Sequence, residues 1–286
     1  MSVNAGARLD RLPLSRFHRR IMRLIGIGMF FDGFDIYIAS TVLGTTLQSG
    51  FSTMGQNALF VSVTFLGMML GSFGTGFLGD RYGRRFTYQA NLALFGIASL
   101  ASAFAPTMGF LIVCRFFMGL GLGAENVVGY STLAEFVPPA ARGRLQGWMA
   151  TFVVTGLPAS ALLGLLLVPS FGWRVMFIVG GLGALVVWYL RKSLPESPRW
   201  LESVGRTAEA EALMTSIEKE VSAEKGALSA PSAAPTVPVS RSFSTLMTRE
   251  MLVRMFVGSV VLIVINTLLY GFVTWLPTFF VSEGMT

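Results

Sequence analysis

Seven apolar runs, each long enough to cross a lipid bilayer as a helix, follow one another through this sequence. Hydrophobic residues make up 53% of the 286 residues and charged residues only 13%, against about 25% charged residues in soluble domains. Because a chain in lipid must satisfy its backbone polar groups internally, this pattern predicts an all-α integral membrane protein. We place the spans at about 21–47, 58–79, 86–105, 110–136, 145–168, 173–190 and 255–281.

Positive charges are distributed unevenly between the two sides of the predicted spans. Of the 22 Lys and Arg residues, twenty lie on the side that holds the N-terminus, Arg174 lies on the opposite side and Arg115 lies inside a span. Basic loops favour the cytoplasmic side of a membrane. We therefore expect a cytoplasmic N-terminus in a bacterial inner membrane, and we attribute the net charge of +7 to topology, not to nucleic-acid binding.

The chain contains one cysteine, Cys114, and one histidine, His18. This composition excludes a disulfide framework and argues against a His/Cys metal cluster. The spans hold no candidate pair of nucleophile and base, so we expect neither an enzyme nor a cofactor. The first twenty residues are polar and basic and no cleavage pattern follows the first apolar run, so we expect that run to stay in place.

The spans and loops group into four regions: a basic cytoplasmic N-terminus at 1–20, a six-span half at 21–192, a cytoplasmic loop at 193–250, and a seventh span at 251–286. Within the loop, 206–225 predicts a charged, weakly amphipathic helix. The Ala-, Pro- and Ser-rich stretch 227–240 predicts a flexible linker. Six spans, a linker and a further span are typical of a transporter with two repeated halves, of which this chain holds the first half and the opening helix of the second.

Four charged side chains lie well inside the predicted spans, away from the span ends, where a charge costs roughly 3 kcal/mol or more unless it has a partner or a watery path. Asp32 and Asp35 lie three positions apart on one face of the first span and indicate the wall of a polar cavity. Either can meet Arg115, which we place at similar depth, and such a pair suits proton coupling. Glu125 is a second protonatable group or a cytoplasmic gate. The alternative for all four is a purely structural role in joining helices.

Glycines cluster in the second and fourth spans, at Gly67, Gly71, Gly119, Gly121 and Gly123. No strand precedes them and no Lys-Ser/Thr follows, so a phosphate-binding loop is disfavoured. We predict that they allow close helix approach.

Mixed charges flank the spans on the basic side. Asp80 among Arg81, Arg84 and Arg85 indicates an ion network that breaks as helices rock. Glu135 with Arg142, and Glu196 with Arg199, are predicted to form similar latches.

These motifs resemble those of the major facilitator superfamily. The stretch from Gly76 through Asp80, Arg81, Gly83 and Arg84 to Arg85 looks like its loop between spans two and three, and Arg115-Phe-Phe-Met-Gly-Leu-Gly looks like its span-four motif. Glu135 with Arg142-Gly-Arg resembles its span-four/five loop, and Pro-Glu196-Ser-Pro-Arg199-Trp resembles the stretch after span six in sugar-porter and organic-acid branches. The resemblance covers seven of the family's twelve spans.

Asp32-Gly-Phe-Asp35 also resembles the Asp-Gly-x-Asp signature of aromatic acid:proton symporters, and 115–200 is similar to nicotinate-type carriers. The resemblance implies proton-driven uptake of a small organic anion by alternating access, with Asp32 and Asp35 handling the proton and Arg115 pairing with them or with a substrate carboxylate. It implies a carrier that is monomeric at full length. A sugar:proton symporter or facilitator is the near alternative, and a non-transporting membrane sensor or truncated remnant is the alternative from another class.

Overall fold

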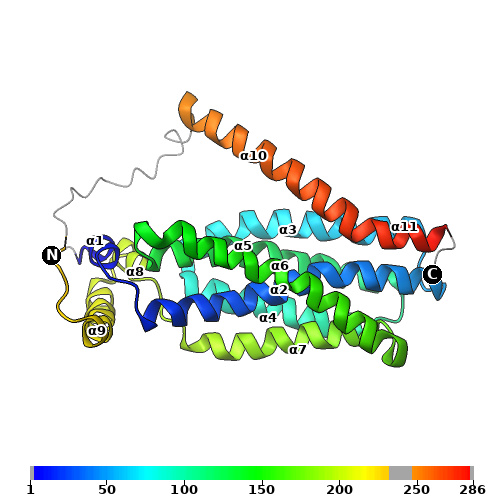
Figure 1. The fold of residues 1–286 in the computed structure, drawn as a ribbon, viewed down its shortest axis with the longest axis horizontal. Helices are drawn as coiled ribbons and strands as arrows, with labels where there is room; N and C mark the ends of the chain where they lie inside the picture. The colour runs from blue at the N-terminus through cyan, green and yellow to red at the C-terminus, as the bar shows by residue number, and fades with distance from the viewer. Residues whose placement is uncertain (1–2, 232–246, 284–286) are drawn as a thin grey trace. The chain divides into compact units, whose positions relative to one another are not determined.

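A computed structural model of the chain describes residues 3–231 and 247–283 (Figure 1). All the regular elements in these ranges are helices, so the predicted all-α class is confirmed. The chain divides into two compact units, Met1–Ser232 and Ala233–Thr286.

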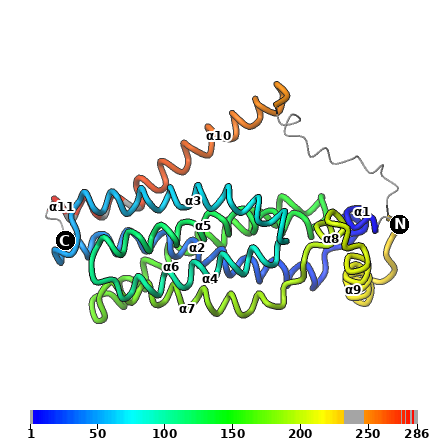
Figure 2. The backbone as a smooth tube through the Cα atoms, turned by 180° about the vertical axis from the view of Figure 1, so that it is seen from behind, coloured from blue at the N-terminus to red at the C-terminus, as the bar shows by residue number. Residues whose placement is uncertain are grey.

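Six long helices of the first unit run side by side and form its bundle (Figures 1 and 2). They are α2 (Arg16–Gln48), α3 (Met54–Tyr82), α4 (Arg84–Ala103), α5 (Met108–Phe136), α6 (Pro139–Phe171) and α7 (Arg174–Leu190). Each overlaps one predicted span in order. Pro139 is the first residue of α6, where the missing N–H of proline costs no helical hydrogen bond.

Shorter helices complete the first unit: α1 (Ala5–Asp10), the 3₁₀ turn η1 (Arg191–Ser193), α8 (Pro198–Ser203) and α9 (Thr207–Lys225). The second unit consists of α10 (Arg249–Tyr270), a π-helical segment η3 (Gly271–Trp275) and α11 (Leu276–Ser282). Together these three cover most of the predicted seventh span. Most of the predicted linker, from residue 232 onward, lies outside the described residues.

Glycines allow the helices of the bundle to touch backbone to backbone. A Cβ added to Gly71 or to Gly123 would lie within 3.0 Å of the carbonyl oxygens of Leu120 and Met68, respectively, which is closer than real Cβ atoms come. Both contacts join α3 to α5, so the predicted close helix approach is confirmed. Gly33 has the same function between α2 and α6.

The bundle presents large apolar side chains outward, as a membrane protein does. Phe73 of α3 and Leu165 of α6 are 78% and 74% exposed. Among the described residues, five stretches are long and apolar enough to cross a membrane by length and composition: Met54–Tyr82, Met108–Phe136, Pro139–Phe171, Arg174–Ser193 and Arg249–Phe280. The spans proposed for α2 and α4, which lie within the same bundle, stay predictions.

The predicted helix at 206–225 is confirmed as α9, which packs against α1 and α8 at one end of the bundle. We call this end, which carries α1, α8 and α9, the basic end. Arg8 of α1 pairs with Glu211 at 2.7 Å and with Glu218 at 2.8 Å, and Arg11 pairs with Glu218 at 2.6 Å. Residues before Arg16 are thus folded against the loop helices.

We expect α9 to loosen from α1 on acidification. Hydrogen bonds from Arg8 and Arg11 hold the pKa of Glu218 below its usual range. A carboxylate with a depressed pKa stabilises the folded state above its unfolded pKa of about 4.3, and this contribution is lost as pH falls through the folded pKa. Protection of the α9 amides, measured relative to the intrinsic exchange rate at each pH, should therefore be high at pH 7 and lower below about pH 4.

The control for this prediction is Glu218→Gln. In this variant the α9 amides should already be less protected at pH 7, and their protection should change less on acidification. Equal protection of α9 at both pH values in the unsubstituted protein would contradict the prediction.

Candidate functional site

Asp35 of α2 and Arg115 of α5 form an ion pair in the interior of the bundle. Arg115 Nη1 donates to Asp35 Oδ2 at 2.5 Å, and the two side chains are 1% and 0% exposed. The other donors of the guanidinium are also used, since Nη2 bonds the Asp35 carbonyl and Nε bonds Thr64 Oγ1 of α3 at 3.0 Å. The ring of Phe60 covers the guanidinium at 5.0 Å. One acid and one base therefore balance each other in a dry site.

Glu125 of α5 has a different partner, Arg191 of η1, which donates from Nη1 to Glu125 Oε1. Arg191 is fully buried, although it follows the last residue of α7. Its Nε and Nη2 donate to the carbonyls of Leu24 and Ile25 in α2, both at 2.8 Å. This second pair ties α2, α5 and the end of α7 together.

Gly28 makes room for the second pair. A Cβ at this position would lie within 3.0 Å of the Arg191 guanidinium. Asp32 follows Gly28 by one helical turn and so lies on the same face of α2. Its carboxylate interacts electrostatically with Glu125 and Arg191, and it is 1% exposed.

The two aspartates expected on one cavity wall thus belong to different clusters. Asp35, and not Asp32, pairs with Arg115. Both side chains are buried between helices and do not form an open wall, because three residues along a helix turn the side chains by about 60° and raise them by 4.5 Å. That offset is enough for neighbouring helices to supply different partners.

Sequence reasoning missed Arg191, which it counted among the topology charges of the loop. A signal was available, because Glu125 lacked a counter-charge and Arg191 is the first cation after the sixth span. An arginine at a helix end can extend its long apolar stem along the bundle and carry its charge inward.

The predicted loop motif lies at the basic end, where Arg84 joins three segments. Arg84 Nε donates to Glu135 and Nη1 to Asp80, both at 3.1 Å. The backbone N–H groups of Arg84 and Arg85 donate to Glu196 Oε1 at 2.9 and 3.3 Å. The turn between α3 and α4 is therefore bonded both to the end of α5 and to the segment after η1.

Gly83 has a φ of 95° in this turn, and a Cβ there would also lie within 3.0 Å of Glu196. Glycine is thus required twice over. Arg81 lies over the ring of Tyr82 at 5.6 Å. Gly76 has no atom within 4 Å of an added Cβ, so the first unit itself places no steric demand on it.

The predicted pairs Glu135–Arg142 and Glu196–Arg199 are wrong. Arg142 and Arg199 both pair with Asp10 of α1, at 3.6 and 2.6 Å. The N-terminal segment folds back over the basic end, so an acid distant in sequence takes the place of the acids nearby.

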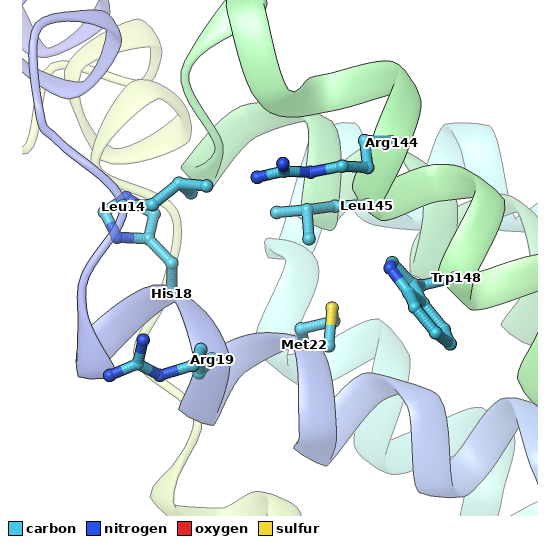
Figure 3. A pocket seen from close by; sticks show the side chains of 7 residues that line it. All are labelled: Leu14, His18, Arg19, Met22, Arg144, Leu145 and Trp148. Atoms are coloured by element: carbon cyan, nitrogen blue, oxygen red, sulfur yellow. The ribbon is translucent and has the colours of Figure 1, made fainter.

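A pocket of about 320 Å³ opens at the start of α2 (Figure 3). Its lining comes from α2, the residues just before it, and α6: Leu14, His18, Arg19, Met22, Arg144, Leu145 and Trp148. Figure 3 shows Arg19 and Arg144 on opposite sides of the opening. Arg144 forms no ion pair within the described part of the chain, and no acidic side chain lines the pocket. Its chemistry suits an anionic, partly apolar group.

Residues 23–285 match the model of a family described as "Sugar (and other) transporter". The chain is 40% identical over 289 residues to the inner membrane metabolite transport protein YdjE of Escherichia coli (strain K12), over 98% of this chain and 63% of that protein. The chain belongs to this transporter family. The niacin transporter NiaP of Acinetobacter baylyi is 32% identical, over 97% of this chain and 63% of that protein. The chain thus spans 63% of the length of both relatives.

A solved structure shares the fold of this chain. The partially occluded inward-open xylose transporter XylE from Escherichia coli matches with a TM-score of 0.65 at 22% identity, over 71% of this chain and 56% of that one. The family match and the relatives, together with this fold, confirm the resemblance to the major facilitator superfamily, and the chain matches 56% of the xylose transporter chain. Its family membership identifies the chain as a multi-pass membrane protein.

Proposed function

We propose that the carrier to which this chain belongs imports a small organic anion together with protons by alternating access. The observation that carries the proposal is the buried Asp35–Arg115 pair, because ionisable groups at bilayer depth are costly and are kept for transport or proton transfer. Asp32, Glu125 and Arg191 add a second set of such groups nearby. We propose a bacterial inner-membrane location with the basic end in the cytoplasm.

An anionic substrate is supported by the pocket in Figure 3, where Arg144 lines an opening that no acidic side chain lines. Arg19, which also lines the pocket, is paired with Glu224 at 3.4 Å. The name of the niacin transporter relative supports an aromatic carboxylate of nicotinate type. A neutral sugar is the second candidate, favoured by the family description and by the xylose-transporter fold.

The test is uptake by the complete carrier in proteoliposomes with nicotinate, 4-hydroxybenzoate and xylose as labelled substrates. We expect an inward proton gradient to drive accumulation of a carboxylate. Asp32→Asn or Asp35→Asn should abolish this accumulation, because an amide cannot take up a proton, while exchange without a gradient persists. Wild-type accumulation in both variants would overturn the coupling role, and accumulation of xylose alone would favour the sugar alternative.

The network around Arg84 is proposed to latch the basic end and to open as the two halves rock. The bonded members of this network are Asp80, Arg84, Arg85, Glu135 and Glu196. The other gating residues that the sequence motifs predict are Gly76, Arg81, Gly83, Arg142 and Arg199.

A membrane sensor that binds a partner through the loop is the competing function from another class. Deleting residues 227–240 should leave transport nearly unchanged, because a flexible linker tolerates shortening. A sensor would lose its partner on the same deletion. Loss of uptake with intact membrane insertion would contradict our assignment of this stretch as a passive linker.

A further inference from the structure

The two buried clusters of the bundle differ in charge balance. The first holds one acid, Asp35, and one base, Arg115. The second holds two acids, Asp32 and Glu125, and a single base, Arg191. We call the second set the Asp32 cluster. With all its groups ionised, this cluster would carry one uncompensated negative charge.

The remaining contacts of the Asp32 cluster do not offset that charge. Arg191 directs its other two donor nitrogens, Nε and Nη2, to the neutral carbonyls of Leu24 and Ile25. Glu125 Oε2 and Asp32 Oδ2 are buried and have no hydrogen-bond partner within the described chain. Both acids therefore keep an unused oxygen in a buried site. Asp35 Oδ1 beside Arg115 also lacks a partner, so the charge balance is what distinguishes the two clusters.

Within residues 3–231, no other helix supplies a second cation to this site, and Arg191 is the cation that interacts with both acids. From α4, the ring of Tyr88 lies under the Arg191 guanidinium at 4.8 Å. Further along α2, the next charged group is Asp35, which Arg115 already neutralises. On α6, no residue from Leu145 to Phe171 is ionisable. On α7, Arg174 lies at the opposite end of the helix and donates to the Ala105 carbonyl, and Tyr189 is exposed.

An unpaired carboxylate in such surroundings is far less stable than its neutral acid, because burial removes the water that solvates the charge. Binding one proton turns one carboxylate into a carboxylic acid and leaves one acid anion opposite one guanidinium. The protonated group also gains an O–H donor, which a carboxylate lacks.

We propose that the Asp32 cluster holds one proton at neutral pH, on Asp32 or on Glu125, balanced by Arg191, whereas Asp35 stays ionised while it is paired with Arg115 and takes up a proton only when that pair separates. The role of the cluster as a loading site of the transported proton rests on the function proposed above. The presence of the proton itself does not depend on transport.

Infrared spectroscopy of the purified chain in lipid nanodiscs tests the proposal, because a carboxylic acid C=O band is distinct from carboxylate bands. At pH 7 we expect one protonated carboxyl per chain among the buried acids. Asp32→Asn and Glu125→Gln should each remove this band completely, because either change leaves a balanced pair with Arg191. Arg191→Met should double the band, because both acids then lack a cation.

Two further variants are controls for the height of the carboxylic acid band. Burial raises the pKa of Glu196 outside the spanning helices, so Glu196→Gln measures any contribution from that residue. The double variant Asp35→Asn/Arg115→Met removes a balanced pair and should leave the band at wild-type height. The two single amide substitutions are nearly isosteric and remove a buried charge, so they should preserve the fold.

A wild-type chain without the band, in sodium-containing and in sodium-free buffer, would overturn the proposal. Survival of the full band in both Asp32→Asn and Glu125→Gln would do the same. A band that behaves as expected, together with uptake that ignores the proton gradient, would leave the proton site standing and remove only the proposed coupling.

Discussion

Arg115→Met should destabilise the purified chain by about 3–5 kcal/mol, because it leaves the Asp35 carboxylate buried without its counter-charge. The loss includes the bond from Arg115 Nε to Thr64 Oγ1 and the contact with the ring of Phe60. Thermal unfolding in detergent, followed by circular dichroism, measures the effect.

The matched variant is Arg115→Met combined with Asp35→Asn. Removing both charges leaves no uncompensated ion, so the double variant should unfold at a higher temperature than Arg115→Met alone. Arg115→Lys keeps the charge but cannot donate to Asp35 and Thr64 together, and it should fall between the single variant and the wild type. Equal unfolding temperatures for the single and double variants would show that the pair contributes nothing beyond packing.

Gly123→Ala should separate α3 from α5 and lower the free energy of unfolding by about 1–3 kcal/mol. An added Cβ would lie within 3.0 Å of the backbone oxygen of Met68, and a backbone atom cannot move aside as a side chain can. Gly74→Ala is the control, because an added Cβ there meets nothing within 4 Å and alanine favours the helix.

The measurement is thermal unfolding of the two alanine variants beside the wild type. We expect Gly74→Ala to match or exceed the wild type and Gly123→Ala to fall clearly below it. If Gly123→Ala were as stable as Gly74→Ala, the helices could separate at no cost, and close packing between α3 and α5 would not hold the bundle together.

Local sequence patterns were enough to predict where the helices lie and which glycines allow helices to touch. Apolar runs between turn residues predict where helices lie, since each span must satisfy its own hydrogen bonds in lipid. Small residues repeated on one helix face predict a close approach, as Gly71 and Gly123 illustrate. These inferences need no knowledge of which helix lies beside which.

The pairing of charges could not be predicted in the same way. Counting residues from the span ends places Arg115 at a depth where it can meet either aspartate. Only the packing of α2 against α5 determines that Asp35 is its partner. Arg142 and Arg199 pair with Asp10, because α1 folds back over the basic end. A salt bridge depends on the last few ångströms between side chains, and sequence spacing does not determine such distances between separate helices.

The sequence by itself thus determined the helical membrane class, the order of the helices, the glycine contacts and the residue types that carry charge into the bundle. Only the tertiary structure decided that Arg191 reaches inward to Glu125 and that Asp32 and Asp35 belong to different clusters. The physical reason is that hydropathy and helix propensity act locally along the chain, whereas charge balance at a buried site is a sum over side chains from several helices.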